Sequence, residues 1–496
     1  FPHPDHHRHA VGTMTMTAMQ RTDNCEHEHK TWNTDEHKPF VQDICFDGLS
    51  IDSNETEHTV EASSRPFHQH RELRRAVNRD IARLKLSVSN TRRSSCEGAK
   101  TIYSAPSSPL PTSESWRRAS TDPTDGWGRA SAGAGGFVGG PQRCLSSPGM
   151  RDLMEGLQNP VNSKMDEDSI ARGLATISTM EFDADSYSDD ELAYLILQVF
   201  LELQLDQHLN ITATKLSLLI EAVQKHMFDN PYHNWTHVAD VFQASYALGL
   251  ASGLMGRLSP LEQFALLISA LCHDLEHPGV NNLTLVKSKP ELCELYGESS
   301  TLEKHHSLRA FSLMLHREVE LLSGMKTTTY YHFRDMVTKI ILATDMGRHA
   351  EYCAKVKQLA SAAPTEESTH QQEMEIIIKC ADTSNVLRPG LVAKQWAVKI
   401  GAEFFAQGDL ERSMGLKVTP TCDRKSQTLV GLQKGFIDFC IGPFFDSVAE
   451  LWPLARDVMA QVWTNRAMWD AYDDHKLYSE MGYALPASEC QFEMEQ

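Results

Sequence analysis

The sequence predicts an all-α protein. Helix start signals recur along the second part of the 496-residue chain, and apolar residues there repeat at helical spacing. Clean alternation of apolar and polar residues, which is typical of half-buried strands, is nearly absent. These observations predict one compact multi-helix domain over residues 176–490, preceded by a low-complexity and mostly disordered region over residues 1–175.

The first region lacks the apolar content needed to build a core. Ser, Pro and Gly dominate residues 87–149, and the histidine-rich start of the chain is interpreted as a low-complexity tail. Two basic clusters that end at Ser95 and Ser120 resemble R-R-x-S kinase sites. Because exposed clusters of this kind are common, the sequence leaves open whether a basophilic kinase acts on these serines.

The predicted helices of the second region begin with recognisable caps. Ser188 and Glu191 form a capping box before an apolar helical stripe. Ser259, Pro260 and Glu262 supply a second start, with a cap, a proline at the first helical position and an acid two residues later. Further helices are expected at Lys304–Leu315, Phe333–Ala343, Gln371–Ala381, Leu391–Phe405 and Leu429–Leu451.

Composition argues against several classes of protein. The net charge of −19 disfavours a phosphate backbone, so no nucleic acid partner is expected. Eleven cysteines without C-x-x-C spacing indicate reduced thiols, which are typical of a cytoplasmic protein. No apolar run reaches the roughly 18 residues of a membrane span, although the start at Phe1 leaves an upstream segment or anchor open. The oligomeric state is also open, a homodimer included.

The stretch Leu271–Asn282, L-C-H-D-L-E-H-P-G-V-N-N, concentrates side chains that can bind metal. On a helix, His273 and His277 at i and i+4 share one face, and Asp274 lies beside the first of them. Taken alone, such a pair is weak evidence, because H-x-x-x-H occurs by chance.

Two remote segments supply the same kinds of side chain. Y-H-N-W-T-H-V-A-D holds His233 and His237 at the same spacing, and the apolar run I-I-I-K-C-A-D-T-S-N carries Asp382. Two histidines and two carboxylates from three segments suit a divalent ion with nitrogen and oxygen ligands. The Asp274 carboxylate can also bridge to a second, harder ion. The pattern therefore predicts a two-metal hydrolase.

With these motifs the chain resembles the catalytic domain of the class I cyclic nucleotide phosphodiesterases, members of the HD metal-dependent phosphohydrolases. The resemblance extends from Tyr194 to Trp452 and is carried by Y-H-N-W-T-H, H-D-L-E-H-P-G-V-N-N, T-L-E-K-H-H, I-L-A-T-D-M, C-A-D-T-S-N and L-Q-K-G-F-I-D-F. A-T-D-M-G-R-H-A-E and S-N-V-L-R-P look most similar to the high-affinity cGMP-selective branch. The resemblance implies an HD-type helical fold and hydrolysis of cGMP or cAMP to the nucleoside 5′-monophosphate, which terminates cyclic nucleotide signalling.

The resemblance implies two metal ions. Four residues would hold a zinc ion: His237, His273, Asp274 and Asp382. A magnesium or manganese ion would be bound directly by Asp274 and otherwise through waters positioned by His277, Glu303 and Thr344. A hydroxide between the two ions would attack phosphorus. His233 matches the family's general acid, which protonates the departing 3′ oxygen.

Simpler roles remain open for several of these residues. Glu303 can complete a capping box with Ser300, Thr344 can bond only its own helix backbone, and Asn385 can merely terminate its helix. The spacing of His277 supports direct ligation equally well. Three polar neighbours are interpreted as structural or orienting residues rather than ligands: His305, His306 and Asp345.

The resemblance also implies a purine pocket. Gln433 matches the family's purine-reading glutamine, whose amide offers a donor and an acceptor. Phe436 matches the aromatic residue that stacks on the purine, opposite Ile400. Tyr232 and Asn385 are expected to line the same pocket.

Two departures from the family pattern leave the choice between cGMP and cAMP open. Val386 stands where the cGMP-selective branch carries an acid that helps to fix the glutamine amide. Ala393 stands where some cAMP-selective members carry a tyrosine that pins it the other way. Without these contacts the Gln433 amide can rotate, so we expect dual specificity with a slight preference for cGMP.

Three other functions compete with this interpretation. A zinc protease of the H-E-x-x-H kind needs glutamate where the chain has Asp274. An HD phosphohydrolase acting on another nucleotide leaves Gln433 and Phe436 unexplained. A catalytically inactive cyclic-nucleotide binder has no evident need for the complete ligand set together with His233.

Overall fold

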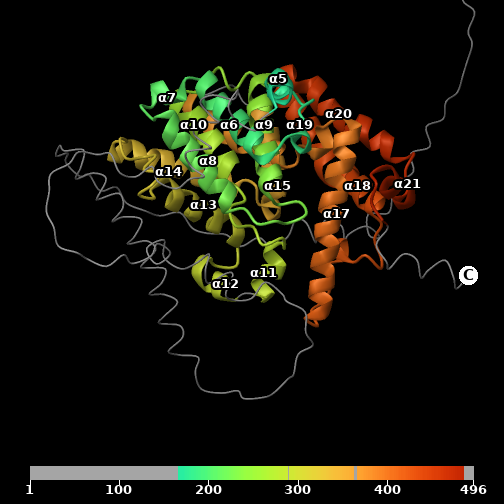
Figure 1. Ribbon diagram of the computed structural model, residues 1–496. Coiled ribbons are helices and arrows are strands. Elements are labelled where there is room, and N and C mark those ends of the chain that lie inside the picture. Colours follow the sequence, from blue (N-terminus) through green and yellow to red (C-terminus); the bar gives the residue numbers. More distant parts are fainter. Residues whose placement is uncertain (1–165, 289, 362–365, 485–496) are drawn as a thin grey trace, which may run out of the picture. The chain divides into compact units, whose positions relative to one another are not determined.

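The computed structural model describes residues 166–288, 290–361 and 366–484, and every regular element in these ranges is a helix (Figure 1). The prediction of an all-α fold is confirmed. The expected domain boundary at residue 175 falls inside the first described helix, α5 (Glu167–Thr176). Ser95 and Ser120 lie outside the described residues.

The elements follow one another with short connections. The first group comprises η2 (Ala184–Ser186), α6 (Asp189–Glu202), α7 (Leu205–His208), α8 (Ala213–Lys225), α9 (Trp235–Ala251), α10 (Pro260–Cys272), α11 (Asn282–Ser288) and α12 (Pro290–Tyr296). The second comprises α13 (Thr301–Met314), α14 (Thr327–Leu342), η3 (Met346–Arg348), α15 (His349–Ser361), α16 (Glu366–Asp382), η4 (Ser384–Leu387) and α17 (Gly390–Ser413). The third comprises η5 (Pro420–Cys422), α18 (Leu429–Phe436), η6 (Ile437–Ile441), α19 (Gly442–Leu451), η7 (Pro453–Ala455), α20 (Arg456–Trp469) and α21 (Asp474–Glu480).

Both predicted capping boxes are present. The Ser188 hydroxyl accepts a hydrogen bond from the backbone N–H of Glu191, whose carboxylate accepts one from the backbone N–H of Ser188. Ser259 and Glu262 repeat this arrangement at the start of α10. Each box satisfies backbone donors that the first turn of a helix leaves without partners, which explains why these two helices begin where the sequence predicts.

Helices α9 and α10 lie at the centre of the domain (Figure 1). α10 packs against α9 and α14, and α9 also packs against α6 and α16. Nearly the whole of α9 is buried, and α10 is buried from Phe264 to Cys272. A helix without a solvent-facing side belongs to a core. Polar side chains at the start of α9 and the end of α10 are therefore held within a packed interior.

The helix predicted over Leu429–Leu451 is continuous but irregular. Its middle, η6, is a π-helix, in which the backbone N–H of Gly442 donates to the carbonyl oxygen of Ile437. Pro443 has no N–H to offer to the carbonyl oxygen of Phe439, so the regular helical ladder cannot continue through this point.

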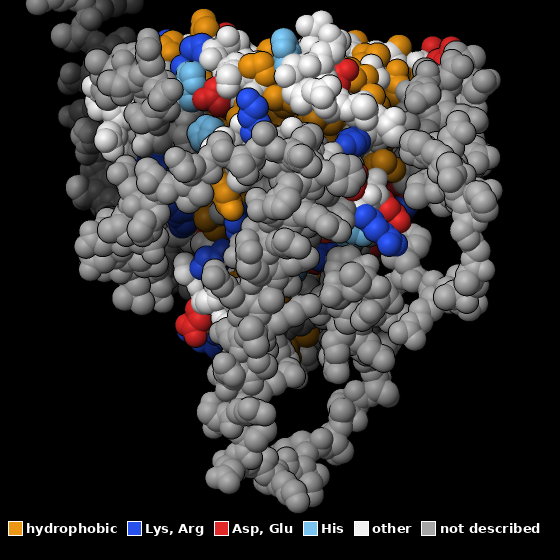
Figure 2. All heavy atoms as spheres, turned by 90° about the vertical axis from the view of Figure 1, so that its left-hand side faces the viewer, with side chains coloured by type: hydrophobic (Ala, Val, Ile, Leu, Met, Phe, Trp, Pro, Cys, Tyr) orange, Lys and Arg blue, Asp and Glu red, His pale blue; other side chains and the backbone are white. Residues whose placement is uncertain are grey.

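The visible surface carries mixed charge. On the face in Figure 2, lysine and arginine side chains lie close to aspartate and glutamate side chains, with hydrophobic and other side chains between them. Among the described residues, no helix is both long enough and apolar enough to cross a lipid bilayer.

Arg388 joins the stretch around Phe182 to helix α9 in the interior of the domain. Its guanidinium is fully buried and lies 2.8 Å from the Asp240 carboxylate. It also donates to the carbonyl oxygens of Phe182 and Asp240, at 3.3 and 3.1 Å. The Asn465 amide in turn donates to the Arg388 carbonyl oxygen at 2.8 Å. The Arg388 guanidinium thus connects the stretch before η2 to α9, and the Arg388 backbone carbonyl adds a contact with α20.

Replacing this cation should destabilise the fold. Arg388→Met leaves the Asp240 carboxylate buried without its partner, and we expect the free energy of unfolding to fall by about 3–5 kcal/mol. Urea denaturation measures the change. Arg172→Met is the control, because the Arg172 side chain is exposed and lies 3.9 Å from Asp166; its transition should not move. A similarly small shift for Arg388→Met would contradict the role assigned to the buried pair.

Candidate metal centre and active site

His237 is placed by the cap of α9. The Asn234 side chain accepts a hydrogen bond from the backbone N–H of His237 at 3.1 Å, which fixes the first turn. The His237 ring is buried and packs against the Tyr232 ring, with centroids 4.5 Å apart. His233 precedes the cap, so the two histidines of this motif do not belong to one helix.

The predicted helical face shared by His273 and His277 does not exist. α10 ends one residue before His273, and the chain then turns through Glu276, whose φ is +61°. The buried Glu276 carboxylate is held by His305 at 2.8 Å and by Arg309 at 2.7 Å. The prediction of a shared face was wrong because these ion pairs stabilise a turn where the spacing indicated a continuing helix.

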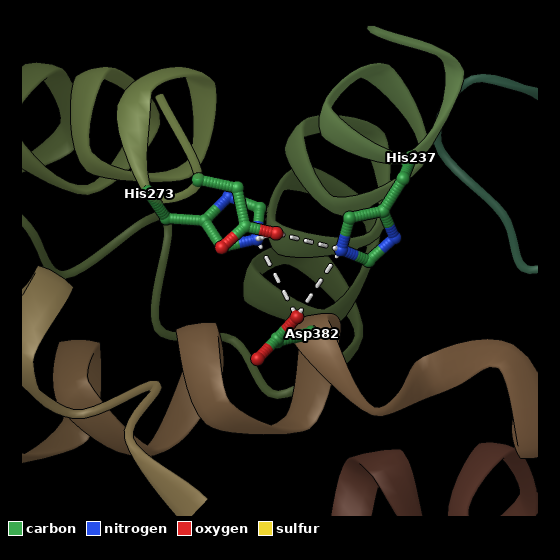
Figure 3. A group of neighbouring side chains, drawn as sticks. His237, His273 and Asp382 are labelled. Carbon is green, nitrogen blue, oxygen red and sulfur yellow. Dashed lines mark ion pairs between the residues drawn. The ribbon is translucent and has the colours of Figure 1, made fainter. Parts of the chain in front are cut away.

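The four side chains expected to bind the first metal converge from three helices: His237, His273, Asp274 and Asp382. Nε2 of His237 lies 3.3 Å from an Asp274 oxygen and 3.4 Å from an Asp382 oxygen. Nε2 of His273 lies at the same two distances from these oxygens. All four ligand atoms lie within 4.8 Å of one another, and Figure 3 shows His237, His273 and Asp382 pointing toward one another.

This geometry fits a divalent cation. Ligand atoms about 2.1 Å from a tetrahedral ion are about 3.4 Å apart, which matches the separations between the imidazole nitrogens and carboxylate oxygens. Nε2 of His237, Nε2 of His273 and one Asp274 oxygen are buried without a hydrogen bond in the described part of the chain. Nδ1 of His273 lies 2.9 Å from the Ala270 carbonyl oxygen. Since Nδ1–H donates there, the Nε2 lone pair is free for a metal.

Further carboxyl groups lie next to this cluster. Glu303 is buried, and the Asn282 amide donates to both of its carboxylate oxygens, at 3.1 and 3.0 Å. Burial, with the Asp345 carboxylate nearby, raises the pKa of Glu303 to about 8. The alternative capping box with Ser300 does not form, because the Ser300 hydroxyl donates to Asp345 at 2.6 Å. A second cation beside Asp274 would relieve this repulsion.

The turn that carries Thr344 is fixed by its backbone. The Thr344 hydroxyl donates to the Ile341 carbonyl oxygen at 2.8 Å, which is the structural role left open by the sequence. The fully buried Lys379 ammonium donates to the carbonyl oxygens of Ala343 and Asp345, at 3.4 and 3.3 Å. Thr344 therefore lies between two residues, Ala343 and Asp345, whose carbonyl oxygens are held by the Lys379 ammonium group.

The neighbouring histidines of α13 are arranged as supports. His306 Nδ1 lies 2.6 Å from the Leu275 carbonyl oxygen, and its Nε2 lies 3.8 Å from an Asp274 oxygen. His305 contacts Glu276, as described above. Neither belongs to the four-residue cluster, which agrees with their interpretation as structural residues.

His233 lies beside the cluster and pairs with Glu403. Its Nδ1 makes a short contact with one Glu403 oxygen, and the other oxygen accepts from the backbone N–H groups of Tyr232 and His233, both at 3.0 Å. Burial opposes the charged imidazole, but the Glu403 carboxylate outweighs it and raises the pKa of His233 to about 9. His233 is therefore protonated at neutral pH, with a proton available on Nε2.

His277 stacks on His233, with ring centroids 3.9 Å apart. Burial and the charge of His233 lower the pKa of His277 to about 4. Its Nδ1 accepts from the Gly279 N–H at 3.1 Å, so the neutral ring carries its proton on Nε2. The ligand atoms of His233, His277 and Glu403 also lie within 4.8 Å of one another. However, a protonated His233 and an Nε2–H on His277 suit proton donation better than metal ligation.

Sequence reasoning missed the two residues that hold this histidine pair, Glu403 and Asn230. The Asn230 amide donates to the carbonyl oxygens of His233 and His277, at 2.9 and 2.8 Å. Glu403 lies three residues after Ile400 on α17, among apolar neighbours. The sequence did offer a signal for Glu403, because a carboxylate on the apolar side of a predicted helix needs a buried partner. For Asn230 the sequence offered no such signal.

The residues expected to bind the purine lie on elements that pack together. Gln433 and Asn385 are buried, at 6% and 8% exposure, so Gln433 does not face bulk solvent. Ile400 and Phe436 are partly buried against the core. α17, which carries Ile400, packs against α18 and η4, which carry Gln433 and Asn385. Ile400 and Glu403 are three residues apart on α17, so one helix face connects this group to His233.

The described residues form a helical domain with a buried His/Asp group that could hold a metal ion. Residues 232–462 match the family described as 3'5'-cyclic nucleotide phosphodiesterase. The matched stretch contains most of the motifs on which the resemblance to this family rests.

Several named phosphodiesterases are also similar to this chain. The chain is 35% identical over 300 residues to the 3',5'-cyclic-nucleotide phosphodiesterase regA of Dictyostelium discoideum, which is 60% of this chain and 38% of that protein. It is 32% identical over 297 residues to the high affinity cGMP-specific 3',5'-cyclic phosphodiesterase 9A of Homo sapiens, which is 60% of this chain and 50% of that protein. The chain thus spans half or less of the length of these relatives.

The crystal structure of the phosphodiesterase domain of Salpingoeca rosetta rhodopsin phosphodiesterase is similar in fold. It matches with a TM-score of 0.58 at 27% identity, covering 64% of this chain and 97% of that domain.

Removing the Glu403 charge should change the titration of His233. In Glu403→Gln we expect the pKa of His233 to fall from about 9 toward its ordinary 6.5. Because the folded pKa is raised, the stability that His233 contributes is present below pH 6.5 and is lost as pH rises through 9; the variant should lack this loss. NMR titration of the His233 ring measures the pKa, and urea denaturation measures the stability.

Glu411→Gln is the matched control for this titration. Glu411 lies on the same helix, but its carboxylate contacts Thr284 and Thr419, so this variant should leave the pKa of His233 unchanged. An equal shift in both variants, or a His233 pKa near 6.5 in the unaltered protein, would contradict the assigned pairing.

Proposed function

We propose that this domain hydrolyses a 3′,5′-cyclic nucleotide to the nucleoside 5′-monophosphate and thereby terminates a cyclic nucleotide signal. The observation that carries the proposal is the convergence of two imidazoles and two carboxylates beside a protonated histidine. The names of the relatives support the substrate class, because they describe phosphodiesterases of cyclic nucleotides.

We assign two divalent ions to the site. Zinc suits His237, His273, Asp274 and Asp382, because two imidazole nitrogens and two carboxylate oxygens are donors that it prefers. Magnesium or manganese suits the Asp274 side, where Glu303 and Asp345 offer further carboxyl oxygens; a bound cation would favour the ionised form of Glu303. When bound, the ions would make water more acidic and neutralise the phosphoryl oxygens.

The chain's own residues would handle the proton and the substrate orientation. The departing 3′ oxygen must leave as an alcohol, and the Nε2–H of His233 is the available donor. Glu403 holds the opposite nitrogen and keeps the ring charged until the proton is transferred. The Nε2–H of His277 can donate to a water. The hydroxyl oxygen of Thr344, whose proton goes to Ile341, can accept from a water, as can Glu303.

We propose that Gln433 reads the purine edge, with Phe436 and Ile400 on its two faces and Tyr232 and Asn385 nearby. In the described part of the chain, the Gln433 amide has no hydrogen-bond partner that would fix its orientation. Val386 and Ala393 are buried apolar residues that cannot supply one. A rotatable amide presents its donor or acceptor as the base requires, which supports activity on both nucleotides with a slight preference for cGMP.

An assay of the purified full chain with cGMP or cAMP and magnesium tests this function. We expect turnover of both nucleotides, a modestly higher kcat/KM for cGMP, and loss of activity with a chelator. His233→Ala should lower kcat by about 10²–10⁴-fold through loss of the general acid. His332→Ala, which changes an exposed histidine on α14, should have no effect.

Several results would contradict the proposal. Absence of turnover on either nucleotide would favour an inactive binder or another substrate. Activity that survives chelation or His233→Ala would remove the assigned mechanism. A strong preference for cAMP would overturn the expected specificity while leaving the reaction class intact.

A further inference from the structure

Helix α17 carries a stripe of buried polar side chains. Glu403, Gln407 and Glu411 are spaced four residues apart and therefore lie on one face. Their exposed fractions are 3%, 3% and 1%. Glu403 holds His233, as described above. Since buried polar groups need partners, the contacts of Gln407 and Glu411 indicate what else this face positions.

Gln407 and Glu411 hold the start of α11. The Gln407 carbonyl oxygen accepts from the backbone N–H of Asn281 at 2.9 Å, and its amide donates to the Thr284 hydroxyl at 3.0 Å. The Thr284 hydroxyl donates to Glu411 in a short contact. The Asn281 side chain accepts from the backbone N–H of Thr284 at 2.9 Å. These bonds form a closed network that fixes the first turn of α11 against α17.

The next residue, Asn282, transmits this position to Glu303. Its amide donates to both Glu303 oxygens, and its side-chain oxygen accepts from the backbone N–H of Leu302 at 2.9 Å. Asn282 thus fixes both the carboxylate of Glu303 and the backbone of the first turn of α13. The path from Gln407 to Glu303 consists of hydrogen bonds and one peptide bond.

We propose that Gln407 is a positioning residue for the second cation, acting through Asn281 and Asn282 on Glu303. The inference rests on the proposed function, which places that cation beside Asp274 and Glu303. A carboxylate that faces an ion through waters must be held in a narrow range of positions, and loss of an outer partner typically weakens metal binding by about 10–100-fold. α17 would therefore position two groups: the proton donor His233, through Glu403, and the Glu303 carboxylate beside the second cation, through Gln407.

Manganese binding to the zinc-loaded full chain, followed by electron paramagnetic resonance, tests the inference without an activity assay. Gln407→Met keeps the side-chain volume and removes the hydrogen bonds to Asn281, Thr284 and Glu411. We expect it to raise the dissociation constant for manganese about tenfold and to leave the zinc content unchanged.

Gln243→Met is the matched control. Gln243 is a buried glutamine of α9 that donates to the carbonyl oxygens of Ile177 and Thr179, at 2.7 and 2.8 Å. It loses two buried hydrogen bonds, against three in Gln407→Met, and should not change manganese affinity. An equal effect of both variants would overturn the inference in favour of general loss of stability.

A double-mutant cycle tests the path. If Gln407 acts through Asn282, Gln407→Met should weaken manganese binding no further in an Asn282→Ala background. Effects that multiply would overturn the assigned path. A manganese site that Gln407→Met leaves unchanged overturns this inference alone. Absence of a manganese site in the unaltered protein overturns the proposed second cation together with it.

Discussion

The site depends on a buried group of imidazoles and carboxylates that a divalent cation would balance. His237, His273, Asp274 and Asp382 place imidazole nitrogens and carboxylate oxygens 3.3–3.4 Å apart in the interior. The ligand oxygens of Asp274 and Asp382 lie within 4.8 Å of each other, which is unfavourable without positive charge between them. The surrounding helices α9, α10 and α16 are packed tightly enough to hold this arrangement, which explains why the ligands lie at helix ends rather than on flexible loops.

A second constraint comes from α17, which sets the groups that surround the charged cluster. One face of α17 carries Ile400, Glu403, Gln407 and Glu411. Ile400 packs against the core, Glu403 contacts His233, and Gln407 and Glu411 both contact the start of α11. Because a helix is stiff along its axis, these groups keep fixed relative positions. The positions of His233 and of the Glu303 carboxyl group are therefore both set by this helix.

Much of this organisation could be predicted from the sequence. The capping boxes at Ser188 and Ser259 and the apolar periodicities are local signals, and they predicted helices that the structure contains. The four cluster residues stood out because three segments carried the same chemistry. The turn at Glu276 could not be predicted, since it depends on ion pairs with residues about 30 positions further along the chain. Glu403 and Asn230 were missed for the same reason, because their roles arise from tertiary contacts.

Zinc K-edge X-ray absorption on the purified protein is the most direct test of the metal centre. Two buried thiols lie close to the cluster in the sequence: Cys272 directly precedes His273, and Cys380 lies two residues before Asp382. Burial raises the pKa of both thiols, which disfavours thiolate ligands. The account predicts a zinc shell of nitrogen and oxygen atoms alone at about 2.0–2.2 Å. A sulfur neighbour at about 2.3 Å, or the same shell after His237→Ala and Asp382→Ala together, would contradict it.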